Sequence, residues 1–154
     1  MKQLKTDVAV IGAGTAGLAA YRAAVAAGKR ALLIEGGPYG TTCARVGCMP
    51  SKLLIAAAEA AHHARHTDAF GVHVDGVVRV DGRAVMDRVK RERDRFVGFV
   101  LEGVESIPAA HKVRGYARFI APGVLQIDAH TRVHATAVVI ATGSSAFIPE
   151  SFRS

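Results

Sequence analysis

Residues 6–17, TDVAVIGAGTAG, decide the fold of this 154-residue chain. Residues 6–11 form a short apolar run that is typical of a buried parallel strand, and the run stops at a glycine. An Ala-rich run over residues 15–27 predicts a helix, which Gly28 would end from the C′ position. Residues 31–34 form a second apolar run, so the sequence predicts a right-handed βαβ unit.

Three glycines after the first strand have the spacing of a dinucleotide-binding turn. Gly12 permits the tight turn, Gly14 lets the backbone approach a pyrophosphate, and Gly17 permits close packing of helix and strand. Glu35, at the end of the second strand, can accept hydrogen bonds from a ribose diol. Residues 36–38 hold no Arg or Lys, so a 2′-phosphate has no obvious partner. The alternative is a glycine-rich turn that binds no ligand.

The only two cysteines of the chain, Cys43 and Cys48, follow this nucleotide motif. A helix N-terminus beside them would lower a cysteine pKa and raise its reactivity. A disulfide across so short a loop would constrain the unfolded chain little, so chemistry explains the pair better than a structural role. Two thiolates are only half of a tetrahedral zinc set. The sequence favours a redox pair, with a structural disulfide and a metal site as alternatives.

Two further side-chain patterns have a structural and a functional interpretation. Lys52 could stabilise negative charge that develops beside an electron-rich cofactor, although a lone lysine is more often solvated. His62 and His66 are four residues apart on a predicted helix and could meet a metal, but no third ligand is apparent. We expect a solvated helix face there and no metal site.

The rest of the chain predicts helices and then strands. Residues 43–65 are predicted to form a helix that Pro50 bends or breaks, and residues 83–105 a second helix. Residues 70–80 between them have an irregular pattern.

After Pro108 the apolar pattern changes to a period of two residues. It predicts an antiparallel meander with strands at 113–119, 124–128 and 132–134, and then a separate buried strand at 137–141. The expected fold class is α/β: a doubly wound, Rossmann-like, mostly parallel sheet with helices on its faces and a small antiparallel β-meander.

Composition and charge narrow the classes of protein. Half of the residues are apolar, so we expect a globular chain, long enough for one domain with a core. The net charge of +7 comes from scattered bases, and the aromatic residues are only three Tyr and six Phe, which disfavours nucleic acid as a partner. No signal peptide and no apolar stretch of membrane-spanning length is found. We expect a cytoplasmic protein with reduced thiols and no membrane partner.

Together the motifs resemble the N-terminal part of the class I pyridine nucleotide-disulfide oxidoreductases, the flavin disulfide reductases that include lipoamide, glutathione and mercuric enzymes. The resemblance covers nearly the whole chain. It rests on residues 12–17 (GAGTAG), Glu35, 42–43 (TC), 47–52 (GCMPSK), 115–119 (GYARF) and 139–144 (VIATGS).

This resemblance implies FAD as the bound cofactor and NAD(H) as the pyridine nucleotide of the full-length enzyme. Cys48 would be the thiol on the flavin side, Cys43 the thiol that exchanges with substrate, and Lys52 would lie near the reactive edge of the flavin. These three are the implied catalytic residues. The implied cofactor-binding residues are Gly12, Gly14, Thr15, Ala16, Gly17, Glu35, Gly36, Thr41, Thr42, Cys43, Cys48, Lys52, Gly115, Ala117, Thr142, Gly143 and Ser144.

Within the family, residues 53–72 resemble the lipoamide dehydrogenase branch more than the glutathione branch. The implied function is electron transfer between a pyridine nucleotide and a dithiol or disulfide substrate, small or lipoyl-bound, through a Cys43–Cys48 disulfide. Mercuric or glutathione reduction is the alternative within the family. The loop reads Gly40-Thr41-Thr42-Cys43 where the family usually has paired glycines, and Arg45 replaces a common Asn.

The resemblance also implies that residues 1–154 are the first part of an FAD-binding domain, a fragment of a longer chain. The nicotinamide domain and the interface domain of the homodimeric family would then lie outside it. By itself the fragment would be a flavin- or nucleotide-binding module without turnover. A third interpretation is a nucleotide-free fragment whose binding face is incomplete.

Overall fold

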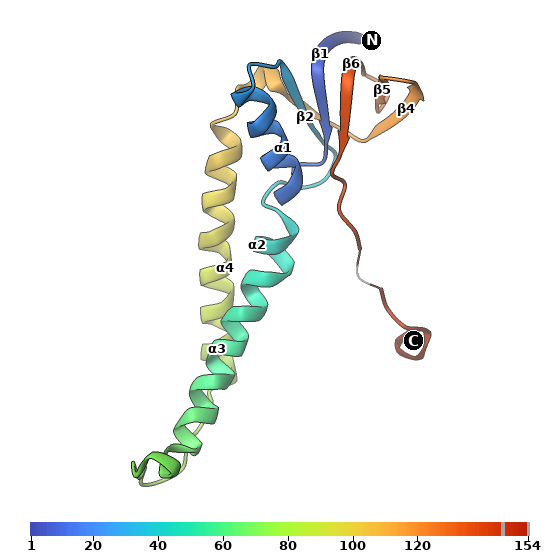
Figure 1. Cartoon of the computed structure of the whole chain (residues 1–154). Coiled ribbons are helices and arrows are strands. Elements are labelled where there is room, and N and C mark those ends of the chain that lie inside the picture. Colours follow the sequence, from blue (N-terminus) through green and yellow to red (C-terminus); the bar gives the residue numbers. More distant parts are fainter. Residues whose placement is uncertain (146, 154) are drawn as a thin grey trace. The chain divides into compact units, whose positions relative to one another are not determined.

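The computed structural model describes residues 1–145 and 147–153 (Figure 1). The chain forms two compact units. The first comprises Met1–Tyr39 and Ile107–Ser154, and the second comprises Gly40–Ser106.

A six-stranded mixed sheet forms the first unit, in the order β3-β2-β1-β6-β5-β4. Strand β1 pairs in parallel with β2 and with β6, and β2 pairs in parallel with β3. Strand β5 pairs antiparallel with β4 and β6. The predicted α/β class, with parallel strands and an antiparallel meander, is therefore confirmed. The strands are β1 (Lys2–Ile11), β2 (Ala31–Glu35), β3 (Lys112–Arg114), β4 (Ala117–Ala121), β5 (Val124–Ile127) and β6 (Thr131–Ile140).

The predicted βαβ unit is β1, helix α1 (Thr15–Ala26) and β2. Helix α1 packs on β1, β2 and β6 and covers one face of the parallel strands (Figure 1). It ends where predicted, because Gly28 takes a left-handed φ of 70° just beyond it. Strand β1 begins at Lys2 rather than at residue 6, since its polar first half pairs with β6, from Lys2 opposite Thr131 onward.

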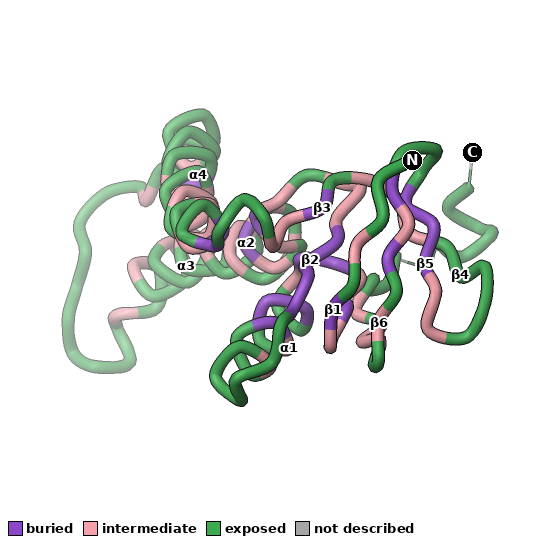
Figure 2. Tube along the Cα trace, turned by 90° about the horizontal axis from the view of Figure 1, so that it is seen from above, coloured by how far each residue is buried: buried purple, intermediate pink, exposed green. Residues whose placement is uncertain are grey.

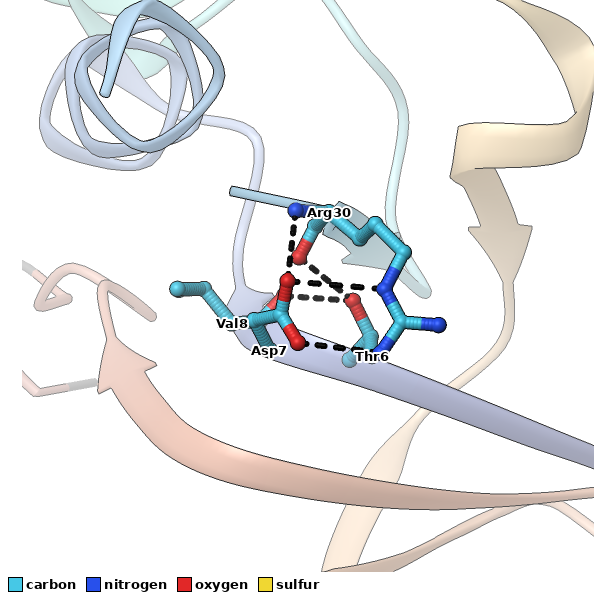
Figure 3. Close-up of polar contacts among 4 residues, drawn as sticks. All are labelled: Thr6, Asp7, Val8 and Arg30. Carbon is cyan, nitrogen blue, oxygen red and sulfur yellow. Dashed lines mark hydrogen bonds and ion pairs between the residues drawn. The ribbon is translucent and has the colours of Figure 1, made fainter. Parts of the chain in front are cut away.

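An ion pair joins β1 to the chain just before β2 (Figure 3). The backbone N–H of Arg30 donates to Oδ2 of Asp7 at 2.9 Å, and its Nη2 donates to Oδ1 at 3.0 Å. These contacts hold the pKa of the Asp7 carboxyl below its usual value, mainly through the side-chain hydrogen bond. Next to it, the Thr6 hydroxyl donates to the Arg30 carbonyl at 2.7 Å. The entry to β2 is thereby fixed against β1.

The prediction of separate strands at 132–134 and 137–141 is wrong, because β6 runs unbroken through both. Its first four residues pair with β5, while its whole length follows β1. The second half is not buried as predicted: Ile140 is 68% exposed. Strand β5 pairs no further than His134, so residues beyond it lack that neighbour.

The predicted strand at 113–119 is divided in two by a turn. Gly115 has a φ of 136°, a conformation that side chains disfavour, and it ends β3. Strand β3 is parallel to β2, and only β4 belongs to the antiparallel meander. The chain therefore turns at Gly115 instead of continuing as one strand from residue 113 to residue 119.

The core of the first unit joins the parallel strands to the meander. Its buried cluster consists of Ala9, Leu32, Ile34, Val113, Leu125, Ile127 and Val133. Figure 2 shows buried residues in α1, β1, β2 and β5. Burying each large aliphatic side chain contributes roughly 1.5–3 kcal/mol. The apolar sides of both parts of the sheet are thus stabilised by one core.

Helices form the second unit: α2 (Thr42–Val46), α3 (Cys48–Arg65) and α4 (Gly82–Glu105), with the short 3-10 helix η1 (Thr67–Phe70). Helices α3 and α4 pack along one another (Figure 1). Asp81 caps α4, since its Oδ1 accepts from the Ala84 N–H at 3.0 Å. Two further 3-10 helices, η2 (Ala109–His111) and η3 (Glu150–Phe152), belong to the first unit.

The single helix predicted over 43–65 is broken at Gly47 and not at Pro50. Gly47 has φ −118° and ψ −109° and separates α2 from α3. Pro50 lies in the first turn of α3, where a backbone N–H has no intrahelical partner in any case. The proline is therefore accommodated without a bend.

Candidate cofactor and dithiol sites

The glycine turn after β1 is packed too tightly for side chains at two of its three glycines. A Cβ on Gly12 would lie 2.2 Å from the Ala141 carbonyl oxygen, and Gly12 itself has a φ of 103°. A Cβ on Gly17 would lie 1.8 Å from the Gly12 carbonyl oxygen. Both contacts are with backbone, which cannot rotate away. Gly12 and Gly17 therefore set how closely β6 and α1 approach the turn.

Gly14 differs from the other two, because nothing lies within 4 Å of the position of its Cβ. It is the N-cap of α1, and no side chain caps that helix. The first turn of a helix presents unpaired N–H groups and a partial positive charge, which together favour a phosphate. Thr15 and Ala16, the next two residues, are exposed. The turn therefore fits the pyrophosphate of a dinucleotide.

Glu35 connects this turn to the loop that follows β2. Its Oε2 accepts a hydrogen bond from the Ala13 N–H, and its Oε1 accepts one from the Gly37 N–H, each at 2.7 Å. A carboxylate has about four acceptor positions, so both oxygens retain capacity for hydroxyl donors. Glu35 is thus held rigidly and can still bind a ribose diol.

Gly36 and Gly115 lie next to Glu35. The Gly115 N–H donates to the Glu35 carbonyl oxygen at 3.1 Å. A Cβ on Gly36 would come within 2.6 Å of the Tyr116 ring, and one on Gly115 within 2.4 Å of Oδ2 of Asp128. Ala117, the last predicted residue of this segment, begins β4. Tyr116 belongs to the 115–119 motif quoted above, and its ring covers Gly36 although the residue is 71% exposed.

Thr142, Gly143 and Ser144 follow the end of β6 and are exposed. The Ala141 N–H donates to the Ile11 carbonyl at 2.8 Å, so this segment leaves the sheet beside β1. The Thr142 nitrogen is 3.2 Å from the position of a Gly12 Cβ. The predicted cofactor residues of the first unit other than Ala117 therefore follow the carboxyl ends of the parallel strands, where open α/β sheets bind ligands. Ala117 is in register with Ile127, which pairs with Thr131 at the start of β6.

Ala13 and Gly37 are two participants that the sequence did not predict. Each contributes only its backbone N–H to Glu35. A backbone N–H can belong to any residue except proline, so the residue types at 13 and 37 do not indicate that they donate to Glu35. Only their spacing from the glycine turn and from Glu35 could have suggested this contact.

The second unit holds the two thiols at a junction between helices. Cys43 is the second residue of α2 and Cys48 is the first residue of α3. Both cysteines are free; Cys43 is partly buried and Cys48 is exposed. The Ser51 hydroxyl, in the first turn of α3, donates to the Cys48 carbonyl at 3.0 Å.

The pKa of the Cys43 thiol lies above its ordinary value of 9.0. A hydrogen bond with the Cys48 side chain is the main cause, followed by burial and by the negative charge that Cys48 carries when ionised. Backbone N–H groups of Cys48 and Met49 act in the opposite direction but are outweighed. The predicted net lowering of the Cys43 pKa is therefore wrong, although the N–H groups at the start of α3 act in the predicted direction.

Thr41 and Thr42 lead into this junction. Thr41 has a φ of 59° and a ψ of 149°, a region in which glycine is favoured. Its hydroxyl oxygen accepts from the Ala44 N–H at 3.2 Å and so caps α2. Close by, a Cβ on Gly40 would lie 2.9 Å from Cδ of Arg45, so the Arg45 stem covers Gly40. Lys52 is exposed on α3, one helical turn beyond Cys48.

The histidine rings of α3 form a stacked pair. The ring centroids of His62 and His66 are 4.1 Å apart, and both residues are exposed. Over residues 1–145 and 147–153, no three His, Cys, Asp or Glu side chains come together as a metal site requires. In the same ranges, no helix has both the length and the apolar character needed to cross a membrane.

The first unit is a dinucleotide-binding α/β unit. This class is defined by the order of its strands, by the glycine turn after β1 and by Glu35 at the end of β2. Residues 6–152 match the sequence profile described as "Pyridine nucleotide-disulphide oxidoreductase", and the chain belongs to that family. Its members are flavoproteins that use FAD together with NAD(H). The predicted family is therefore confirmed.

Individual relatives agree with this assignment. Mitochondrial dihydrolipoyl dehydrogenase of Pisum sativum is 34% identical over 149 residues, which is 91% of this chain and 29% of that protein. Leghemoglobin reductase of Vigna unguiculata is 33% identical and covers 91% of this chain and 28% of that protein. The chain thus spans less than a third of these relatives.

A solved structure supports the same fold. It is a cysteine-to-serine mutant of the HOCl-induced flavoprotein disulfide reductase RclA of Escherichia coli in a Cu(II) complex, with a TM-score of 0.68 and 23% sequence identity. The match covers 96% of this chain and 30% of that one.

Proposed function

We propose that this chain is the FAD- and dithiol-bearing part of a disulfide oxidoreductase whose substrate is dihydrolipoamide. The observation that carries the proposal is the placement of the two free thiols, Cys43 in α2 and Cys48 at the start of α3, on either side of the break at Gly47. A dithiol becomes a redox centre only when an electron carrier is available, and the open turn at Gly14 fits one. The nicotinamide and dimer-forming parts of the enzyme are proposed to lie in a longer protein.

Each predicted cofactor residue has a proposed role in binding FAD. Gly14 and the first turn of α1 would hold the pyrophosphate, and Glu35 would accept from the adenosine ribose. Residues 115–117 would line the adenine, and Thr142 to Ser144 would approach the flavin half. The chemistry that bound FAD supplies is two-electron transfer between NAD(H) and a disulfide.

The thiol chemistry follows from exchange between the Cys43–Cys48 disulfide and a dithiol. One substrate thiolate attacks the Cys43 sulfur, which breaks the disulfide and releases the Cys48 thiolate. The second substrate thiol then attacks the mixed disulfide, so the substrate leaves as a disulfide and Cys43 takes a proton. The substrate loses two electrons and the cysteine pair gains them. A thiol of higher pKa leaves more slowly, so the raised pKa of Cys43 favours only the protonation of its sulfur once the substrate disulfide has formed.

The choice of dihydrolipoamide as substrate rests on the relatives. Dihydrolipoyl dehydrogenases and a leghemoglobin reductase have nearly equal identity to this chain. A second candidate function is an FAD-binding module without turnover, which the open turn at Gly14 and the positioned Glu35 favour because neither depends on the thiol pair. NADH oxidation separates the two: turnover by the purified chain would exclude the module.

The visible absorption spectrum of the purified chain with FAD tests the redox proposal. After mild dithiol reduction, we expect a long-wavelength charge-transfer band from a thiolate against the flavin. Cys48→Ser should abolish this band while FAD remains bound, and the matched variant Cys43→Ser should retain it. A band of equal strength in Cys48→Ser would contradict the proposed assignment of the two thiols. If the unsubstituted chain binds FAD but shows no charge-transfer band, the FAD-binding module without turnover remains as the proposed function.

A further inference from the structure

Three polar side chains lie in register across the antiparallel strands of the first unit. Arg118 of β4 is opposite Gln126 of β5, and Gln126 is opposite Arg132 of β6. Directly opposed residues project from the same face of a sheet. Leu125 and Ile127, which alternate with Gln126, are fully buried in the core. Arg118, Gln126 and Arg132 therefore project from the face of the meander that is turned away from the core.

These three side chains line a hollow of about 640 Å³ together with Tyr116, Ala117 and Asp128. The hollow therefore shares Tyr116 and Ala117 with the segment that is proposed to line the adenine of FAD. The volume is in the range of small-molecule sites, about 300–1,000 Å³. Gln126 is only 4% exposed, and its Nε2 donates to the carbonyl oxygens of Asp128 and Thr131 at 2.8 and 3.3 Å. A buried and hydrogen-bonded amide thus stands between two arginines.

Positive charge in the hollow exceeds negative charge. The Nε atom of Arg132 is buried and has no hydrogen-bond partner among the described residues. Leaving such a charged donor unpaired is costly, and native structures rarely do so without a ligand or water. Within the described ranges, Arg118 forms no ion pair either.

Among the described residues, Asp128 is the only carboxylate that lines the hollow, and it has other contacts. Its Oδ1 accepts from the Tyr116 N–H at 3.2 Å, and its Oδ2 lies 3.8 Å from Nε2 of His130. Asp128 therefore holds the turn between β3 and β4 rather than pairing with an arginine.

We propose that this hollow binds a phosphate group, a function that nothing in the proposed redox chemistry requires. A guanidinium presents parallel N–H donors that match two oxygens of a phosphate. The Cα atoms of Arg118 and Arg132 are two strand spacings apart, roughly 10 Å, so two extended side chains can enclose one tetrahedral anion. The group would come either as free inorganic phosphate or as a small phosphate monoester.

Amide NMR of the ¹⁵N-labelled chain tests the proposal with inorganic phosphate as the probe and sodium chloride at equal ionic strength as the reference. We expect saturable shifts in the amides of residues 116–118 and 126–132. Arg118→Gln and Arg132→Gln should each weaken binding by roughly tenfold, the effect of losing one charge-assisted contact. Arg22→Gln, which removes an exposed arginine from α1 of the same unit, should change binding by less than twofold. A second titration with glycerol 3-phosphate identifies the source, because tighter binding than inorganic phosphate indicates a monoester and weaker binding indicates the free ion.

The same NMR titration distinguishes phosphate bound in the hollow from phosphate bound at the glycine turn, because different amides shift in the two cases. Saturable shifts confined to residues 12–17, or equal affinity in both arginine variants and the unsubstituted chain, would overturn the proposal. Should Arg132→Gln fail to fold, Arg132→Lys keeps the charge but loses the planar pair of donors. Weaker binding by Arg132→Lys would then support the proposal, and unchanged binding would reject it.

Discussion

The carboxylate of Glu35 accepts a 2.7 Å hydrogen bond from the backbone N–H of Ala13, so the end of β2 holds the turn that follows β1. Its other oxygen accepts from Gly37 at the same distance. Two loops that a dinucleotide would contact are therefore positioned by one side chain before any ligand binds.

Glu35→Gln should lower both stability and FAD affinity. The amide keeps one acceptor oxygen but turns an NH₂ group toward a backbone donor, so one charge-assisted hydrogen bond is lost at a cost of about 2 kcal/mol. Urea unfolding and FAD titration would measure the two effects. Glu59→Gln, an exposed carboxylate on α3, is the matched control and should leave both unchanged. Equal behaviour of the two variants would show that the Glu35 contacts do not hold the turn.

Gly14 and Gly17 should respond differently to the same substitution. Gly17→Ala places a Cβ 1.8 Å from a backbone oxygen and should cost about 3 kcal/mol or more. Gly14→Ala enters open space, so its cost should be about 1 kcal/mol, the usual effect of a poorer N-cap. The new methyl group would nevertheless occupy the space that a pyrophosphate needs, and FAD affinity should fall. Retained FAD affinity in a folded Gly14→Ala variant would exclude this turn as the phosphate site.

Thr41→Gly should stabilise the second unit by about 1 kcal/mol. It relieves a backbone conformation that costs about 1–3 kcal/mol for a residue with a side chain, while glycine replaces the lost cap almost fully. The greater freedom of glycine in the unfolded chain offsets part of the gain. Thr42→Gly provides the comparison, since Thr42 is helical and its replacement should be destabilising. Thermal unfolding of both variants decides the sign.

Removing the Cys48 thiol should make Cys43 more reactive at lower pH. The pKa of Cys43 is raised mainly by its hydrogen bond with Cys48, so Cys48→Ala should move that pKa down toward 9.0. The rate of iodoacetamide modification of Cys43, followed by mass spectrometry from pH 7 to 10, would show the shift. Ala44→Gly, adjacent to Cys43 in α2, controls for loosening of the helix. No difference between Cys48→Ala and the unsubstituted chain would mean that the two thiols do not interact in solution.

The Asp7–Arg30 ion pair should make the free energy of unfolding depend on pH in the acid range. The pKa of Asp7 is lower in the folded chain than its ordinary value of 3.8, so the pair is fully stabilising above that value. This contribution is lost as the pH falls through the lowered pKa. The stability difference between the unsubstituted chain and Asp7→Asn should therefore be present at pH 7 and disappear in strong acid. Asp75→Asn, at an exposed position of the second unit, should show no such trend in urea unfolding.

Local signals allowed the sequence to predict the βαβ unit. A glycine, a helix period and a second apolar run lie within 30 residues, and each element pairs with its neighbour in the chain. Strand β6 was harder, because its pattern changes halfway while its backbone continues along β1. Burial of its second half depends on how far β5 extends, which no local pattern encodes.

The thiol site shows a similar limit. Sequence spacing identified Cys43 and Cys48 as a pair, and their contact supports it. The direction of the Cys43 pKa shift could not be predicted, because it depends on which of two opposing contacts is stronger. The break at Gly47 was also missed, since proline is the more familiar helix breaker and the first-turn position of Pro50 was visible only in the structure.

The pairing of β1 has a consequence for how the chain is synthesised. Strand β1 lies between β2 and β6 and pairs with β6 along its whole length, from Lys2 to Ile11. During translation, the edge of β1 that pairs with β6 therefore stays unpaired until β6, more than a hundred residues further along the chain, has been synthesised. Contacts so distant in sequence form slowly, and an unpaired strand edge invites association with other chains. We therefore expect the β1 edge to be the part of the nascent chain most open to association until β6 is synthesised.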